Sequence, residues 1–215
     1  MGKPATIEFD NWRFYEDGTE NGSTPIANQD TNVTGRNVDS DSQVQLRVLL
    51  QETNGGSGDA TDDYGLEYAL NAGGTPSWVA VTGASAVVQA DTGSSLTDGG
   101  ATTNRGTNGI TGGSGTFVAG EQEAGNGVIE DNQITASNYT ESVWGLILVS
   151  ADLSNGDTID FRVTRNGGTP GVTENVVPRI TVSKTVTDVF FENQNKIEQG
   201  MKPNTAAGMG GILVE

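Results

Sequence analysis

The chain has 215 residues and a formal net charge of −17, with 31 glycines and neither histidine nor cysteine. Without histidine it lacks the usual general base and the commonest transition-metal ligand, and without cysteine it has no disulfides. A surface this acidic repels phosphate backbones and anionic lipid, so we expect neither nucleic acid nor a membrane among its partners.

The length suits one large β domain, or a smaller domain with arms, and a hydrophobic content of 33% limits the core. The opening residues MGKPATIEFD contain no apolar segment typical of a secretory signal. No run approaches the ~20 apolar residues of a membrane helix. These features predict a soluble protein made in the cytoplasm.

Alternating apolar residues predict β-strands in the first third of the chain. In residues 5–15 the alternation changes phase between Phe9 and Trp12, which is typical of a bulge or a break. Residues 25–42 are mostly polar and predict a long surface connection with at most one short edge strand. Residues 43–53, QVQLRVLLQET, predict a strand with Gln45 and Arg47 facing outward and four apolar residues facing inward: Val44, Leu46, Val48 and Leu50.

The middle of the chain predicts a hairpin followed by a long loop. Residues 64–70 and 78–81 alternate on either side of the turn NAGG, and we expect Trp78 to cap one end of the core. Residues 85–90 predict another short strand. Residues 91–115 have almost no apolar content, and a loop of this length is usually functional, disordered or held by a neighbour.

The densest apolar block lies in residues 139–163, YTESVWGLILVSADLSNGDTIDFRV. Its turn at residues 154–157 separates two apolar segments, which predicts a hairpin of two core strands. Weaker strands are expected to begin at residue 116 and at residue 128. Residues 176–186 predict a late strand whose start, at Pro178, lies at a sheet edge because proline cannot donate to a ladder.

These elements predict an all-β fold: an antiparallel, jelly-roll-like β-sandwich with long glycine-rich loops and an extended C-terminal arm. The sandwich domain is expected to span residues 1–187, with long surface loops at 25–42 and 91–115, and the arm residues 188–215. The arm has apolar groups that it cannot bury against itself, although a frayed terminus is the alternative. Its candidate subunit-contact residues are Phe190, Phe191, Ile212, Leu213 and Val214.

Clustered carboxylates are the one feature that suggests bound metal. Calcium prefers carboxylate and loop carbonyl oxygens, which Asp59, Asp62 and Asp63, or Asp39 and Asp41, would supply. No segment matches the twelve-residue EF-hand pattern, and the alternative is a solvated acidic loop. No other cofactor is predicted.

Paired carboxylates also suggest glycoside hydrolysis, which uses two acidic groups. The candidate pairs are Asp62 with Asp63, Glu121 with Glu123, and Glu130 with Asp131. Among 28 acidic residues such pairs arise easily, and no lysine lies in a recognisable Ser-Lys motif. We therefore expect no catalytic residues and no enzyme.

Several segments together resemble a known family: WRFYEDGTENGSTPIANQDTNV, LRVLLQET, the YGLEYALN hairpin, TDGGATTNR, GTFVAGE and the 139–163 block. The family comprises uncharacterised virion-type β-sandwich proteins of tailed bacteriophages and prophages, and the likeness covers about residues 7–183. The resemblance implies a structural protein on the particle, either a capsid decoration (cement) protein or a tail component. It assigns no functional residues.

We therefore expect a virion protein that decorates the capsid, forms a homo-oligomer such as a trimer, and contacts other virion proteins such as the major capsid protein. The alternative is a carbohydrate-binding or adhesin-type sandwich on a tail fibre or cell surface. That function would need exposed aromatic side chains, for which Trp12, Trp78 and Tyr139 are the candidates, although strand aromatics more often belong to the core.

Overall fold

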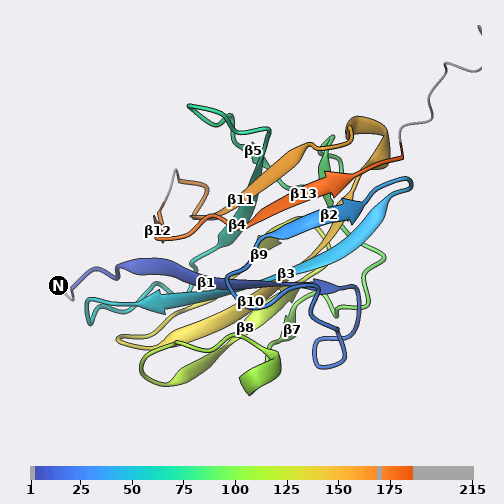
Figure 1. Cartoon of the computed structure of the whole chain (residues 1–215). Helices are drawn as coiled ribbons and strands as arrows, with labels where there is room; N and C mark the ends of the chain where they lie inside the picture. The colour runs from blue at the N-terminus through green and yellow to red at the C-terminus, as the bar shows by residue number, and fades with distance from the viewer. Residues whose placement is uncertain (1–2, 169–170, 186–215) are drawn as a thin grey trace, which may run out of the picture. The chain divides into compact units, whose positions relative to one another are not determined.

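The computed structural model describes residues 3–168 and 171–185 and shows an all-β protein, as predicted (Figure 1). The chain divides into two units, Met1–Lys184 and Thr185–Glu215. The predicted arm and its five subunit-contact candidates lie outside the described residues, so they stay predictions. Everything below concerns the first unit.

Two sheets form the body. The first has the strand order β12-β1-β3-β10-β8-β7, with β6 also paired to β10. Its strands are β1 (Ile7–Glu16), β3 (Ser42–Glu52), β6 (Val88–Ala90), β7 (Gly100–Ala101), β8 (Phe117–Glu123), β10 (Tyr139–Leu148) and β12 (Thr173–Glu174). The second has the order β2-β13-β11-β4-β5, with β9 also paired to β4. Its strands are β2 (Val33–Asn37), β4 (Tyr64–Leu70), β5 (Val79–Ala80), β9 (Val128–Ile129), β11 (Thr158–Arg165) and β13 (Arg179–Ser183).

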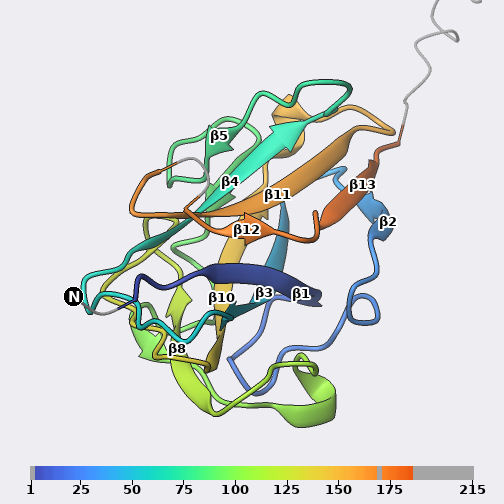
Figure 2. The same cartoon turned by 90° about the vertical axis from the view of Figure 1, so that its left-hand side faces the viewer.

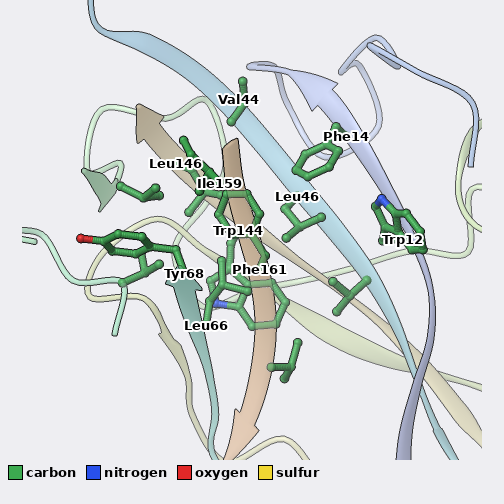
Figure 3. Packing of buried hydrophobic residues seen from close by; sticks show 14 of the residues in the cluster. Trp12, Phe14, Val44, Leu46, Leu66, Tyr68, Trp144, Leu146, Ile159 and Phe161 are labelled. Carbon is green, nitrogen blue, oxygen red and sulfur yellow. The ribbon is translucent and has the colours of Figure 1, made fainter. Parts of the chain in front are cut away.

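The two sheets enclose one hydrophobic core (Figure 2). Side chains of β1, β3 and β10 face those of β4 and β11, and the rings of Phe14 and Phe161 meet across the sandwich at 5.8 Å between centroids (Figure 3). Trp144 is fully buried, and its indole Nε1 donates to the carbonyl of Gly127 at 3.2 Å. Burial of large apolar side chains, at ~1.5–3 kcal/mol each, is the main stabilising contribution.

The sheets are mixed and not purely antiparallel. β8 runs parallel to β10, β12 to β1, and β2 to β13. Between β8 and β10 the chain visits the second sheet as β9, and such a crossover lets the next strand return in the same direction. The jelly-roll connectivity stays a prediction.

The predicted hairpin at residues 139–163 is wrong. Its two strands, β10 and β11, belong to opposite sheets, and the 3-10 helix η2 (Ser150–Asp152) lies in the connection between them. Both strands bury one face in the same core. Alternation alone therefore cannot distinguish strands that pair from strands that face each other.

Of four other local predictions, two are confirmed and two are wrong. The phase change in β1 is a register shift between Phe9 and Asn11, and β4 pairs with β5 as the expected hairpin. However, Trp78 lies outside the core, half-buried under the guanidinium of Arg162. The predicted sheet edge at Pro178 is also wrong, because β13 lies between β2 and β11 in the second sheet. The sheet tolerates Pro178 because the strand begins one residue later, at Arg179.

The largest departure concerns the outer face of the first sheet. Gln45 and Arg47, predicted to face solvent, are each only 1% exposed. Residues 91–115, with β7 and the 3-10 helix η1 (Gly106–Asn108), pack over this face as a third layer, seen below β8 and β10 in Figures 1 and 2. We call this segment the cover loop.

Candidate functional site

A buried ion network lies between the cover loop and the first sheet. Arg47 of β3 donates from Nε to Glu141 of β10 at 2.5 Å and from Nη2 to Glu20 at 2.8 Å. Its Nη2 also donates to the carbonyl of Thr103 in the cover loop at 2.6 Å. One cation thus connects two strands of the molecule's interior to the loop above them.

The two carboxylates of this network have opposite pKa shifts. Burial raises the pKa of Glu141, and this outweighs the nearby Arg47 guanidinium. Burial also favours a higher pKa for Glu20, but the backbone N–H of Thr103 and the guanidinium of Arg47 outweigh it and lower the pKa. Glu20 is therefore the more readily ionised partner of Arg47.

Further contacts hold the cover loop along its length. The Thr102 hydroxyl donates to the carbonyl of Glu141 at 2.5 Å, and the Tyr15 hydroxyl donates to the carbonyl of Asn108 at 2.7 Å. The Arg105 guanidinium lies 4.9 Å from the centroid of the Tyr15 ring. Asp17 accepts hydrogen bonds from both Ser94 and Ser95, and hydrogen bonds from these serines outweigh burial and lower its pKa.

Every cationic side chain of the described residues is engaged within the body. Five form ion pairs: Arg36, Arg47, Arg162, Arg165 and Arg179. Four donate to backbone carbonyls: Lys3, Arg13, Arg105 and Lys184. Since the chain has 28 acidic and 11 basic residues, the carboxylates without a cationic partner dominate the charge of its surface.

The three calcium candidates Asp59, Asp62 and Asp63 accept different hydrogen bonds. Asp62 is 1% exposed and accepts hydrogen bonds from Arg165, from Asn166 and from the backbone N–H of Asp59. Burial favours a higher pKa for Asp62, but these donors outweigh it and lower the pKa. Asp59 accepts from Thr61, and Asp63 from the backbone N–H of Asp131. These contacts brace the loop before β4.

Three of the other carboxylate candidates, Glu123, Asp41 and Asp39, also accept hydrogen bonds from nearby groups. Glu123 Oε1 accepts from the backbone N–H groups of Gly125, Asn126 and Gly127 at 2.6–2.8 Å. Asp41 accepts from the backbone N–H of Ser150, and the Asn37 amide donates to Asp39. Within residues 3–168 and 171–185 no three His, Cys, Asp or Glu side chains are grouped so that they could hold a metal ion.

Glu121 of β8, two residues before Glu123, lies in an acidic neighbourhood. Burial raises its pKa to about 7, and four carboxylates add to the effect: Glu123, Asp98, Glu130 and Asp131. These carboxylates favour a negative potential around Glu121.

The three aromatic candidates differ in exposure. Trp12 is 7% exposed and belongs to the core. Tyr139 is half-buried, with its ring edge-on to Phe117 and its hydroxyl accepting from Asn104. Trp78 is half-buried, and the Arg162 guanidinium lies 4.5 Å from its ring centroid. Arg162 in turn pairs with Glu67 at 2.6 Å.

Close to Trp78 in the chain, a pocket of about 370 Å³ opens on the outer face of the second sheet. β5 and β9 each pair with β4, one after the other along the same edge of that strand. They meet at Leu66, whose N–H donates to Gly127 and whose carbonyl accepts from Val81. We call the cavity at this meeting point the junction pocket.

The lining of the junction pocket combines three kinds of residue. Apolar lining residues are Leu66, Ala80, Val81 and Val128, of which Leu66 and Val81 are core residues only 1% exposed, and three glycines, Gly65, Gly127 and Gly167, leave room. Its polar side chains are Asp63, Glu67, Thr82, Asn126 and Thr164. Of these, sequence reasoning singled out only Asp63. A usable signal was Gly65, because a glycine inside a strand often marks close approach of a ligand or another backbone.

No helix of the described residues is long and apolar enough to cross a membrane. In comparisons with known proteins, no family model, no curated protein and no solved structure matches this chain.

Proposed function

We propose that this chain is a structural virion protein of a tailed bacteriophage, acting as a capsid decoration (cement) protein that stabilises the particle through contacts between subunits. The observation that carries the proposal is the cover loop, which buried polar contacts fix on the first sheet. The longest loop of the body thereby becomes a third layer of a braced sandwich. A rigid body with an acidic surface suits a mechanical role.

The chemistry of the side chains also supports a structural role. The sequence has no histidine and no cysteine. The candidate acids Asp62 and Glu123 accept several hydrogen bonds from neighbouring groups of the protein, which suits bracing better than proton transfer to a substrate. We therefore propose a protein that is not an enzyme.

The proposed partners are other copies of this chain, in a homo-oligomer such as a trimer, and the major capsid protein. Residues 188–215 carry apolar groups that would be buried across such interfaces, with ~25 cal/mol per Å² gained before the ordering cost. The proposed location is the virion.

Deleting residues 188–215 tests this mechanism. The truncated chain is expected to keep its thermal unfolding temperature but to lose oligomers in analytical ultracentrifugation and binding to undecorated particles in co-sedimentation. Full binding and unchanged oligomers after the deletion would contradict the role of the arm.

A carbohydrate-binding or adhesin-type module is the second candidate. The observation that favours it is Trp78, which lies two residues before Ala80 of the junction pocket. Strong binding on a glycan array, lost after Trp78→Ala, would place this function first. Loss of that binding in EDTA would add a calcium requirement.

A further inference from the structure

We propose that the junction pocket receives a basic side chain, a lysine or an arginine, presented by a neighbouring protein. This inference rests on the proposed function in one respect, that the body docks on another protein. It adds the chemistry by which the partner is recognised.

The shape suits a long side chain with an apolar stem. The volume of about 370 Å³ lies at the lower end of the ~300–1,000 Å³ of ligand pockets. Exposed Ala80 and half-buried Val128 supply aliphatic wall, and Gly65, at an outward-facing position of β4, leaves room for a stem. Lysine and arginine bury their methylene stems along such walls while the charged head stays polar.

The charge around the pocket is negative. Arg162 and Arg165 are the nearby cations, and each is held in an ion pair, with Glu67 and Asp62 respectively. The pocket residue Asp63 and the neighbouring Asp131 have no ion pair among the described residues. Asp131 lies next to Asp63, since its backbone N–H donates to the Asp63 carboxylate at 3.1 Å.

The negative potential extends beyond the pocket itself. The Asn126 amide of the pocket wall reaches Glu130, two residues after Val128, at 3.5 Å. The raised pKa of Glu121 reports the same field, because Glu130 and Asp131 both contribute to it. The lining residue Asp63 and the acids that contact lining residues, Asp131 and Glu130, favour a cationic head group over a sugar or an anion.

Nuclear magnetic resonance titration tests the pocket directly. The probe is Nα-acetyl-lysine methylamide, with Nα-acetyl-arginine methylamide as its counterpart and the uncharged Nα-acetyl-norleucine methylamide as control. We expect saturable shifts of the backbone amides of Gly65, Gly127 and Gly167 with millimolar affinity for the two basic probes. The norleucine probe should leave these amides unmoved.

A matched pair of variants separates the pocket from the general acidity of the surface. Asp63→Asn keeps an oxygen that can accept from Asp131 but removes the charge, and it should weaken lysine binding about fivefold. Asp152→Asn removes an exposed carboxylate in η2 and should leave binding unchanged. Equal weakening by both variants, shifts spread over exposed loops, or the same shifts with a methyl glycoside would overturn the proposal.

Carbodiimide cross-linking on intact particles distinguishes this inference from the proposed function. We expect Asp63, Glu130 or Asp131 to be joined to a lysine of a neighbouring virion protein. Particles that carry the chain but show only cross-links elsewhere would refute the pocket and leave the virion role standing. Particles that lack the chain would refute the virion role, whatever the titration shows.

Discussion

At the scale of single residues, the most deeply buried ion pair of the described residues is that of Arg47 and Glu141. Glu141 is 0% exposed, so removal of its cation leaves an uncompensated buried charge. Arg47→Met should therefore lower the free energy of unfolding by about 3–5 kcal/mol in urea denaturation at pH 7. The matched control is Glu16→Gln, which removes the charge from an ion pair with Arg36 whose acid is 51% exposed and should cost at most ~1 kcal/mol. Equal costs for both variants would contradict the buried network.

Gly127 is a second residue on which the body depends. Its φ is +85°, and an added Cβ would lie 2.1 Å from the carbonyl oxygen of Val81. Gly156 has a φ of +88° with nothing within 4 Å, so Gly156→Ala measures the backbone strain alone, ~1–2 kcal/mol. Gly127→Ala should cost ~1–3 kcal/mol more through overpacking, as thermal and urea unfolding would show. A cost no larger than that of Gly156→Ala would argue against the tight junction of β4, β5 and β9.

Glu121 makes the stability depend on pH. Its pKa is about 7 in the folded protein, above the ordinary 4.5, so the folded state holds the proton more tightly. Stability is then lost as the pH rises from about 4.5 to 7. Glu121→Gln should be more stable than the wild type at pH 8 and equally stable at pH 4, in urea denaturation at each pH. A difference that is the same at both pH values would contradict the acidic neighbourhood.

At the scale of elements, the cover loop is the feature whose order can be measured. Arg105 is its only lysine or arginine, so trypsin cleavage there reports local opening of the loop. Thr102→Val removes the hydrogen bonds to Glu141 and from Gly120, worth ~1–3 kcal/mol, and should speed cleavage after Arg105 about tenfold. Thr97→Val, at an exposed position of the same loop, is the control. Rapid cleavage of the wild-type loop would show that the cover is not held.

The elements also show which features of the fold the sequence patterns could predict. Period-two alternation was enough to predict β3, β4 and the bulge of β1, because each buries one face in a single core. It could not assign β10 and β11 to opposite sheets, since both present the same pattern to that core. Nor could alternation show that Arg47 is buried. The cover loop contacts Arg47 through polar groups, and its sequence has almost no apolar residues that would predict such packing.

The candidate site was less predictable than the fold. The junction pocket forms where Leu66, Val81 and Gly127 meet, and these residues come from three separate segments. No local motif marks such a meeting point. Only Gly65, an interruption in an otherwise regular strand, gave a sign of it, whereas the acidic pairs that stood out in the sequence mostly brace turns.

At the scale of the whole molecule, the distribution of charge decides what the body can bind. All the cations of the described residues are engaged internally, so the outer surface offers carboxylates to a partner. The proposed partners are therefore expected to be basic where they meet the body, as proposed for the junction pocket, and apolar where they meet residues 188–215.

We propose that this chain is an abundant structural part of a phage particle. The most direct test is quantitative mass spectrometry of intact particles, purified on a density gradient from the phage or prophage that encodes the chain. The proposal predicts that the chain stays with the particles, in a copy number of the same order as the major capsid protein. Absence from intact particles would contradict the structural role, and a few copies per particle would contradict capsid decoration.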